Sequence, residues 1–217
     1  VLLEDLRAYP DLEIIVTDGG SRDQTPTIAR EFGVRFVSSE KGRCFQLNTG
    51  AQAATGEVLL FLHCDTFLPE NFSEHLHEVL GRRGTSVGAF RLKIDAPGAG
   101  FRLIEWGANL RSRWWRLPYG DQALFVRRDI FARAGGFPEF PIMEDIGLVR
   151  RLKKLGRVRI AATPVTTSAR RWQKFGLVRT TLMNQVLLCG LFVKADPDRL
   201  RRLYDRGTDA GVTKAQS

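Results

Sequence analysis

The sequence predicts an α/β fold with a mainly parallel sheet that is covered by helices on both faces. Short apolar runs rich in Val, Ile and Phe recur along the chain, and segments with helical periodicity separate most of them. Buried strands that alternate with amphipathic helices are typical of this fold class. The predicted strands are Leu12–Thr17, Val34–Ser38, Val58–Leu62, Val87–Ile94, Ala123–Val126 and Val158–Ala161.

Local signals place the helix boundaries. Thr25 precedes a proline, and Pro69 precedes a glutamate, so each pair is expected at a helix start. Proline fits there because the backbone N–H that it lacks would have no partner within the helix. Gly33 and Gly156 are each expected at the end of a helix that precedes them, because glycine readily adopts the left-handed conformation of a helix C-terminus.

The simplest domain division is one domain over residues 1–206, with a helical C-terminal extension over about residues 170–206. Residues 207–217 are polar and are predicted to form a flexible tail. The segment Val1–Tyr9 has the pattern of the end of an amphipathic helix and leads directly into a strand. We therefore expect a further N-terminal strand before Val1.

Composition limits the classes of protein. The chain has 217 residues and is 43% hydrophobic, which suffices for a buried core and excludes disordered and fibrous classes. Its formal net charge is +9, which indicates attraction to polyanions such as nucleotides, nucleic acid or anionic lipid headgroups. Charge alone does not choose among these three.

Cysteine use and hydropathy bear on location. Cys44, Cys64 and Cys189 are odd in number and far apart, so neither a disulfide framework nor a zinc site is indicated, and a reducing cytoplasm fits best. The most apolar stretch, near Val186–Val193, is well short of the roughly 20 residues that span a bilayer. No transmembrane helix is predicted.

Three acidic clusters follow predicted strands or open a helix. They are Asp18-Gly19-Gly20-Ser21, His63-Cys64-Asp65-Thr66 and Glu144-Asp145. Ligands of open α/β sheets bind beyond the carboxyl ends of the strands, so the three clusters are expected at one edge. Taken singly, each also has a structural interpretation as a turn, a strand-end turn or a helix start that complements the helix dipole.

Basic and aromatic groups supplement these clusters. Arg43, followed by Gln46 and Asn48, suits a phosphate because a guanidinium binds it through two parallel hydrogen bonds, although a surface arginine is the alternative. The run Arg170-Arg171-Trp172 either contacts a ligand or forms a basic helix start with Trp172 packed on the sheet.

Together the motifs resemble the family 2 glycosyltransferases of the GT-A fold, over nearly the whole chain. The motifs that carry the resemblance are Glu13–Ser21 with Asp23 and Thr25, Gly42-Arg43 with Gln46, Asn48 and Gly50, Gly56–Thr66, and Gly135-Gly136-Phe137 before Glu144-Asp145. The Tyr119-Gly120-Asp121-Gln122 and Ser168–Trp172 segments are most similar to a bacterial subgroup associated with arsenosugar biosynthesis.

The resemblance implies a nucleotide and metal site. Asp65 corresponds to the last acid of the family's D-x-D motif and would hold Mn²⁺ or Mg²⁺ against the donor diphosphate, a hard cation on hard oxygens. His63 stands in place of the first acid and would contact the metal or the ribose. The implied nucleotide-binding residues are Asp18, Gly20, Arg43, Gln46, Asn48 and His63.

The resemblance also implies an inverting reaction in which a sugar passes from a UDP- or GDP-sugar to a hydroxyl acceptor. Asp145 would be the general base that removes the acceptor proton. The acceptor would be a small molecule, a glycan or a lipid-linked compound. The residues implied for donor or acceptor binding are Gly120, Asp121, Gln122, Glu144, Arg170, Arg171 and Trp172.

Two other functions compete with this hypothesis. A sugar nucleotidyltransferase would usually open with a Gly-rich loop containing Lys or Arg, which this sequence lacks. A non-catalytic nucleotide- or nucleic-acid-binding module would explain the charge, but Arg residues are spread along the chain beside an acidic edge. We therefore expect no nucleic-acid partner.

Two apolar segments outside the motifs have open roles. Phe101–Leu117 is either a core helix that buries Phe101, Ile104 and Leu110 or an acceptor-side flap that offers its tryptophans, and the flap is slightly favoured. Leu182–Val193 is flanked by basic residues, so it either packs on its own domain or docks on the inner face of an anionic membrane.

Overall fold

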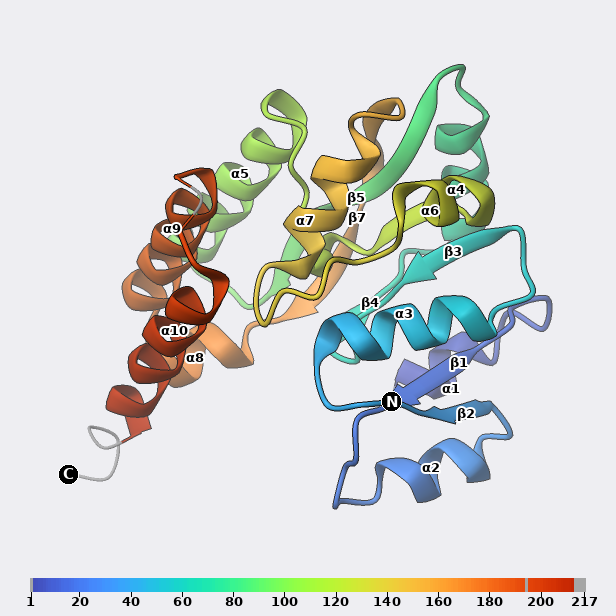
Figure 1. The fold of residues 1–217 in the computed structure, drawn as a ribbon, viewed down its shortest axis with the longest axis horizontal. Coiled ribbons are helices and arrows are strands. Elements are labelled where there is room, and N and C mark those ends of the chain that lie inside the picture. Colours follow the sequence, from blue (N-terminus) through green and yellow to red (C-terminus); the bar gives the residue numbers. More distant parts are fainter. Residues whose placement is uncertain (1, 194, 213–217) are drawn as a thin grey trace.

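The computed structural model describes residues 2–193 and 195–212. The first half of the chain alternates helices with short strands (Figure 1). Its elements are α1 (Leu2–Leu6), β1 (Ile15–Asp18), α2 (Thr25–Glu31), β2 (Arg35–Ser38), α3 (Arg43–Ala53), β3 (Val58–Phe61), β4 (Thr66–Phe67), α4 (Phe72–Gly81) and β5 (Thr85–Asp95).

The second half contributes two strands and most of the helical residues. Its elements are α5 (Ala99–Trp114), the 3-10 turn η1 (Gly120–Gln122), β6 (Leu124–Arg127), α6 (Arg128–Ala134), α7 (Glu144–Leu152), β7 (Arg157–Ser168), α8 (Arg170–Phe175), α9 (Leu177–Phe192) and α10 (Pro197–Val212). Helices α5, α8, α9 and α10 form a block on the side of the molecule away from β1 and β2 (Figure 1).

The strands form two sheets in the part of the chain that the structure describes. The larger sheet has the order β3-β6-β5-β7-β4, and β1 and β2 form a separate parallel pair. The α/β class is confirmed, and the larger sheet is mixed rather than mainly parallel: of its neighbouring pairs β5–β7 is parallel, whereas β3–β6, β6–β5 and β7–β4 are antiparallel. An alternation of strands and helices does not reveal that β6 enters the sheet in the opposite direction.

Helices cover both faces of the larger sheet. On one face, Phe72, Leu76 and Val79 of α4 pack against Phe90 and Phe125. On the other face, helix α7 packs against alternate residues of the same strands, because successive side chains of a strand point to opposite faces. This second cluster contains Val87, Ala89, Leu124, Val126, Ile146, Val149 and Leu152.

The predicted boundaries differ from the observed ones mainly at the ends. Helix α2 begins at Thr25, one residue before the predicted first helical residue Pro26, so Gln24 and not Thr25 is the N-cap, and α4 begins at Phe72, after Pro69 rather than at it. The short strand β4 was not predicted. Helix α10 continues to Val212, into the residues 207–217 for which a flexible tail was predicted, and residues 213–217 lie outside the described part.

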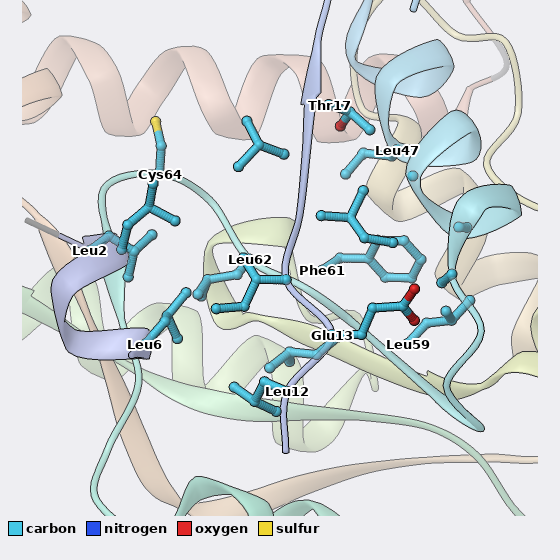
Figure 2. Close-up of a pocket in the computed structure, with 18 of the residues that line it drawn as sticks. Leu2, Leu6, Leu12, Glu13, Thr17, Leu47, Leu59, Phe61, Leu62 and Cys64 are labelled. Carbon is cyan, nitrogen blue, oxygen red and sulfur yellow. The ribbon is translucent and has the colours of Figure 1, made fainter. Parts of the chain in front are cut away.

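An apolar cleft of about 870 Å³ separates β1 from the larger sheet (Figure 2). Leu2 and Leu6 of α1, Leu12, and Leu59 and Leu62 around β3 line it. Among the described strands β1 pairs only with β2, and β3 pairs only with β6, so each presents an unpaired edge. The additional strand expected before Val1 stays a prediction, and this cleft is where such a strand would pair.

No helix within residues 2–193 and 195–212 combines the length and the apolar character that a membrane crossing requires.

The contact between Gly88 of β5 and the ring of Phe125 on β6 provides a test of the sheet. A Cβ at position 88 would overlap that ring, and the ring is fully buried between α4 and the sheet. Gly88→Ala should therefore lower the free energy of unfolding by about 1–3 kcal/mol, as overpacking of a tight core does.

Gly107→Ala is the matched control in chemical denaturation. Gly107 lies on an exposed face of α5, and a Cβ there meets no atom within 4 Å. The same change should stabilise the protein by about 0.5–1 kcal/mol, since alanine favours helix. Equal effects at both positions would contradict the packing described for β5 and β6.

Candidate active site

The antiparallel pairing of β3 and β6 brings two sequence motifs to one edge of the sheet. Phe61, at the end of β3, is opposite Leu124, at the start of β6. Residues that follow β3 therefore lie beside residues that precede β6. This places His63 next to Gly120, where an added Cβ would lie 2.6 Å from His63 Nε2.

Asp145 joins the same edge from the first turn of α7. Its Oδ2 accepts a hydrogen bond from the Gly120 N–H at 2.6 Å, and its Oδ1 accepts one from the Ile146 N–H at 2.7 Å. Each carboxylate oxygen can accept two hydrogen bonds, so a lone pair remains on each. The carboxylate is fixed in orientation and retains the capacity to accept a proton.

Arg43, at the start of α3, links His63 to Glu144. Its Nη2 lies 2.8 Å from His63 Nδ1 and 3.0 Å from Nε2, and its Nε lies 3.3 Å from Glu144 Oε1. Burial and the positive charge of Arg43 lower the pKa of His63 to about 4, so the imidazole is neutral at pH 7. Burial and the neighbouring Asp145 raise the pKa of Glu144, and Arg43 opposes that shift.

Asp121 and Tyr119 bury polar atoms that the described residues leave without hydrogen-bond partners, namely Asp121 Oδ1 and the Tyr119 hydroxyl. Burial raises the pKa of Asp121 to about 6, with Arg111 opposing the shift, and burial raises the pKa of Tyr119 to about 12. The guanidinium of Arg111 lies 3.4 Å from the centre of the Tyr119 ring. Buried unpaired polar atoms are costly, so this pair is a candidate for contact with a ligand hydroxyl.

Arg111 is a site residue that the sequence analysis missed. It belongs to the face of α5 that also carries Phe101, Ile104, Ala108 and the buried Ser112. An arginine on an otherwise apolar or small helix face is the signal that could have found it, because a buried cation needs a partner.

Asp18 ends β1 in a tight turn. Its carboxylate accepts hydrogen bonds from the Gly20 N–H at 3.0 Å, the Ser21 N–H at 2.9 Å and the Ser21 hydroxyl. These hydrogen bonds, led by the Ser21 hydroxyl, lower the pKa of Asp18. Gly20 has φ +93°, a conformation that L side chains rarely adopt. The acid is therefore ionised and held by its own turn at the strand end.

Asp65 lies just beyond His63 and its side chain is 39% exposed. Arg170 of α8 approaches it, with Nη2 3.7 Å from Asp65 Oδ2. The described residues contain no group of three His, Cys, Asp or Glu side chains placed to hold a metal ion. Asp65 therefore suits a cation that takes one carboxylate ligand from the protein and its other ligands from a diphosphate and water, as is common for Mg²⁺.

Three predicted ligand residues instead make internal hydrogen bonds. Gln46 donates to the Thr17 carbonyl at 3.2 Å, and Asn48 exchanges two hydrogen bonds of 2.9 Å with the backbone of Phe137. Gln122 is fully buried and donates to the Phe90 carbonyl while it accepts from Ser112. Asn48 and Gln122 therefore hold loops of the candidate site together, and their contact with ligand stays a prediction.

The side chains of the Arg170-Arg171-Trp172 segment point to different places: Arg170 toward Asp65, and Arg171 and Trp172 toward neighbouring helices and the sheet. Arg170 reaches Asp65, as described above. Arg171 donates to Asn184 and lies over the Tyr204 ring, and Trp172 is buried in a cluster with Leu92, Ile94 and Phe101. For Trp172 the structural alternative, packing on the sheet, is the correct one.

Solved structures with the same architecture are glycosyltransferases. Glucosyl-3-phosphoglycerate synthase from Mycobacterium tuberculosis, in complex with Mn²⁺, uridine diphosphate and glucosyl-3-phosphoglycerate, is similar at a TM-score of 0.59 and 20% identity, over 87% of this chain and 74% of that one. The mannosyltransferase PcManGT from Pyrobaculum calidifontis, in complex with GDP-Man and Mn²⁺, gives 0.58 and 20%, over 77% and 51%. At these identities the likeness shows the fold alone, and it is the GT-A fold.

Sequence comparison defines the family. The model of glycosyl transferase family 2 matches residues 2–138, more than half of the chain, so the chain belongs to glycosyltransferase family 2. The probable glycosyltransferase YdaM of Bacillus subtilis is 29% identical over 174 residues, which are 68% of this chain and 41% of that protein. The chain thus spans less than half the length of this relative. Membership of the arsenosugar-associated subgroup stays a prediction.

The raised pKa of Asp121 gives a testable pH dependence. The folded protein holds the Asp121 proton up to about pH 6, against 3.8 ordinarily, so above pH 6 the ionised carboxylate opposes folding. Asp121→Asn should therefore raise the unfolding temperature near pH 7.5, and its advantage should shrink as the pH falls below 6. Thermal unfolding across this range measures both effects.

Asp95→Asn, at an exposed strand end, is the control and should show no such pH-dependent gain. An Asp121→Asn protein that is less stable than wild type at pH 7.5 would contradict the absence of a partner for Oδ1.

Proposed function

We propose that this chain is the catalytic domain of an inverting glycosyltransferase that moves a sugar from a UDP- or GDP-sugar to a hydroxyl acceptor with the help of a divalent metal. One observation carries the proposal: Asp145, His63, Arg43 and Asp121 meet at the edge of the sheet where β3 ends. A base, a cation and a buried hydroxyl-binding group are thereby brought together.

The reaction needs a proton acceptor on the acceptor side. Asp145 takes the proton from the acceptor hydroxyl while that oxygen forms a bond to the anomeric carbon, and the bond from this carbon to the diphosphate oxygen breaks. The hydrogen bonds from Gly120 and Ile146 hold the carboxylate in one orientation, which favours a positioned base. Asp121 and Tyr119 contribute buried polar atoms to bind acceptor or donor hydroxyls.

The leaving nucleoside diphosphate needs positive charge. Arg43 and Arg170 reach this edge, and Asp65 offers one carboxylate to Mn²⁺ or Mg²⁺. Asp65 would hold such a metal, which would supply positive charge to the leaving diphosphate. Two solved structures with this fold hold a nucleotide or nucleotide sugar together with Mn²⁺, which supports the assignment.

Asp18 and its turn are the proposed contact for the nucleotide base or ribose. Its position at the end of β1, directly after Thr17, which lines the cleft together with His63, supports this role. The acceptor class is a small molecule, a glycan or a lipid-linked hydroxyl compound. Free Cys44, Cys64 and Cys189 support a reducing, cytoplasmic location, with the reaction at or near the inner face of a membrane.

Substitution of Asp145 tests the base. Asp145→Asn keeps size but removes the proton acceptor, so turnover should fall by roughly 10²–10⁴ while UDP or GDP binding persists. One backbone N–H also loses its partner, which should cost about 1–3 kcal/mol of stability, so unfolding must be measured beside activity. Asp129→Asn, an exposed acid in the first turn of α6, is the control and should retain full turnover. A folded Asp145→Asn enzyme with most of its transfer rate would refute the assignment.

Substitution of Asp65 tests the metal. Asp65→Asn removes one negative oxygen ligand, so the gain in nucleotide affinity caused by Mn²⁺ should fall about tenfold or more, and affinity without metal should change little. Calorimetric titration with UDP and with GDP, each with and without Mn²⁺, measures this and also decides between the two nucleotides. Asp95→Asn should leave the metal effect intact. An unchanged metal effect in Asp65→Asn would show that this carboxylate does not hold the cation.

A further inference from the structure

Helix α5 presents a stripe of exposed apolar side chains. Leu103, Trp106, Leu110 and Trp114 recur at helical spacing and are 67%, 63%, 37% and 75% exposed. The opposite face of the helix packs on β5 through Phe101, Ile104 and Ala108. Of the residues that the core-helix alternative placed in the core, Phe101 and Ile104 pack inward and Leu110 is exposed, and the tryptophans lie on the outer, apolar face of this packed helix. The acceptor-side role stays a prediction.

Helix α9 has a second stripe. Val178, Leu182, Val186 and Val193 lie four or seven residues apart along the helix and its C-terminal flanking residue, and all are exposed. The other side of this helix is buried at Leu187, Leu188 and Leu191. The helix therefore packs on its own domain, as one alternative required, and still leaves an apolar face outward.

The two helices are neighbours, as Figure 1 shows. They meet at their N-terminal ends, where an added Cβ on Gly100 would lie 2.8 Å from the side chain of Leu177. We call their exposed side chains the α5–α9 face. It holds ten of the fourteen large exposed hydrophobic residues of the described part: Leu103, Trp106, Leu110, Trp114, Trp115, Val178, Leu182, Val186, Phe192 and Val193.

The charge of the protein is concentrated in the same elements. Residues 99–116 and 170–217, which contain this face, carry fourteen Lys and Arg against five Asp and Glu. Their net charge of +9 equals that of the whole chain, because the other residues carry nineteen of each sign. Arg113 and Arg116 at the end of α5 and Arg199 and Arg202 on α10 are exposed. The segments that carry the apolar face therefore also carry the whole net positive charge of the sequence.

We propose that the α5–α9 face docks on a lipid bilayer that carries anionic headgroups. Tryptophan and arginine both have an apolar body and a polar end, so they suit the boundary between headgroups and acyl chains. Amphipathic helices with Trp and Leu on one face and basic residues around it bind in the plane of such an interface. Anionic lipids supply the opposite charge.

Charge and apolar surface together favour a bilayer over two other possible partners of the α5–α9 face, a second copy of the chain and a nucleic acid. A second copy of this chain would bring a second +9 surface against the first, and the two would repel. A nucleic acid would match the charge and could stack bases on the aromatic rings, but it would leave the six exposed leucine and valine side chains of the face without an apolar partner. The anionic bilayer satisfies both properties of the face.

The face lies beside the proposed active site. Phe101 and Ile104 of α5 pack with Trp172 of α8, and the adjacent Arg170 reaches Asp65. Docking through α5 and α9 would therefore hold the site close to the membrane surface. Binding to vesicles does not require catalysis, so it can be tested independently of glycosyl transfer.

Intrinsic fluorescence gives a direct readout, because Trp106, Trp114 and Trp115 are exposed on the face and the fourth tryptophan, Trp172, is buried. With vesicles of phosphatidylglycerol and phosphatidylcholine the emission should shift to shorter wavelength and the protein should sediment with the vesicles. Vesicles of phosphatidylcholine alone should bind it at least about tenfold more weakly, and added salt should weaken binding to the anionic vesicles.

Matched variants locate the contact. Trp106→Ser/Trp114→Ser should reduce vesicle binding about tenfold or more with little change in unfolding temperature, since both side chains are exposed. Ile28→Ser/Leu155→Ser removes two exposed apolar residues elsewhere and should bind like wild type. Equal binding by wild type and Trp106→Ser/Trp114→Ser would overturn the proposal. A concentration-dependent dimer that the tryptophan variant abolishes, without vesicle binding, would identify a second copy as the occupant and also overturn it.

Discussion

The burial of β5, on both faces over residues 86–90 and on one face over residues 91–95, is the constraint on which the rest of the structure depends. Its side chains enter all three core clusters: Val87 and Ala89 face α7, Phe90 faces α4, and Leu92 and Ile94 face α5 and α8. Side-chain groups of α5 also bond its backbone, since Asn109 binds Leu92 and Glu105 accepts from Ile94. One strand thereby fixes the helices that border the active site and those that form the α5–α9 face.

Much of the fold could be predicted because burial leaves a pattern in the sequence. The run Val87–Ile94 lies within β5; residues 87–90 are apolar on both faces, and beyond them only the face with Leu92 and Ile94 is apolar, because Arg91 and Lys93 are exposed. Strand direction leaves no such pattern. β6 has the same composition whether parallel or antiparallel, so its reversal, which brings Gly120 and Asp121 to the active-site edge, could only be seen in the structure.

The candidate site residues that could be predicted from the sequence are those whose charge suits the chemistry and whose position follows a strand or opens a helix. Asp65, Asp145 and Arg43 are charged residues that follow a strand or open a helix, and all reach the same edge. Asn48 and Gln122 were assigned to ligands because they belong to the same motifs, but amides serve equally well as internal clamps. A motif identifies which residues a site needs and does not distinguish those that touch ligand from those that hold its loops.

The cleft between β1 and β3 has a consequence for how the protein behaves in concentrated solution (Figure 2). Each of the two strands presents a row of backbone groups that no other described strand pairs with, and leucine side chains lie between them. An unpaired strand edge is a template for any extended polypeptide, including one from another molecule. A strand that fills this cleft would pair with both edges at once and so remove both as sites of association between molecules. The occupancy of the cleft therefore governs the tendency of the protein to aggregate.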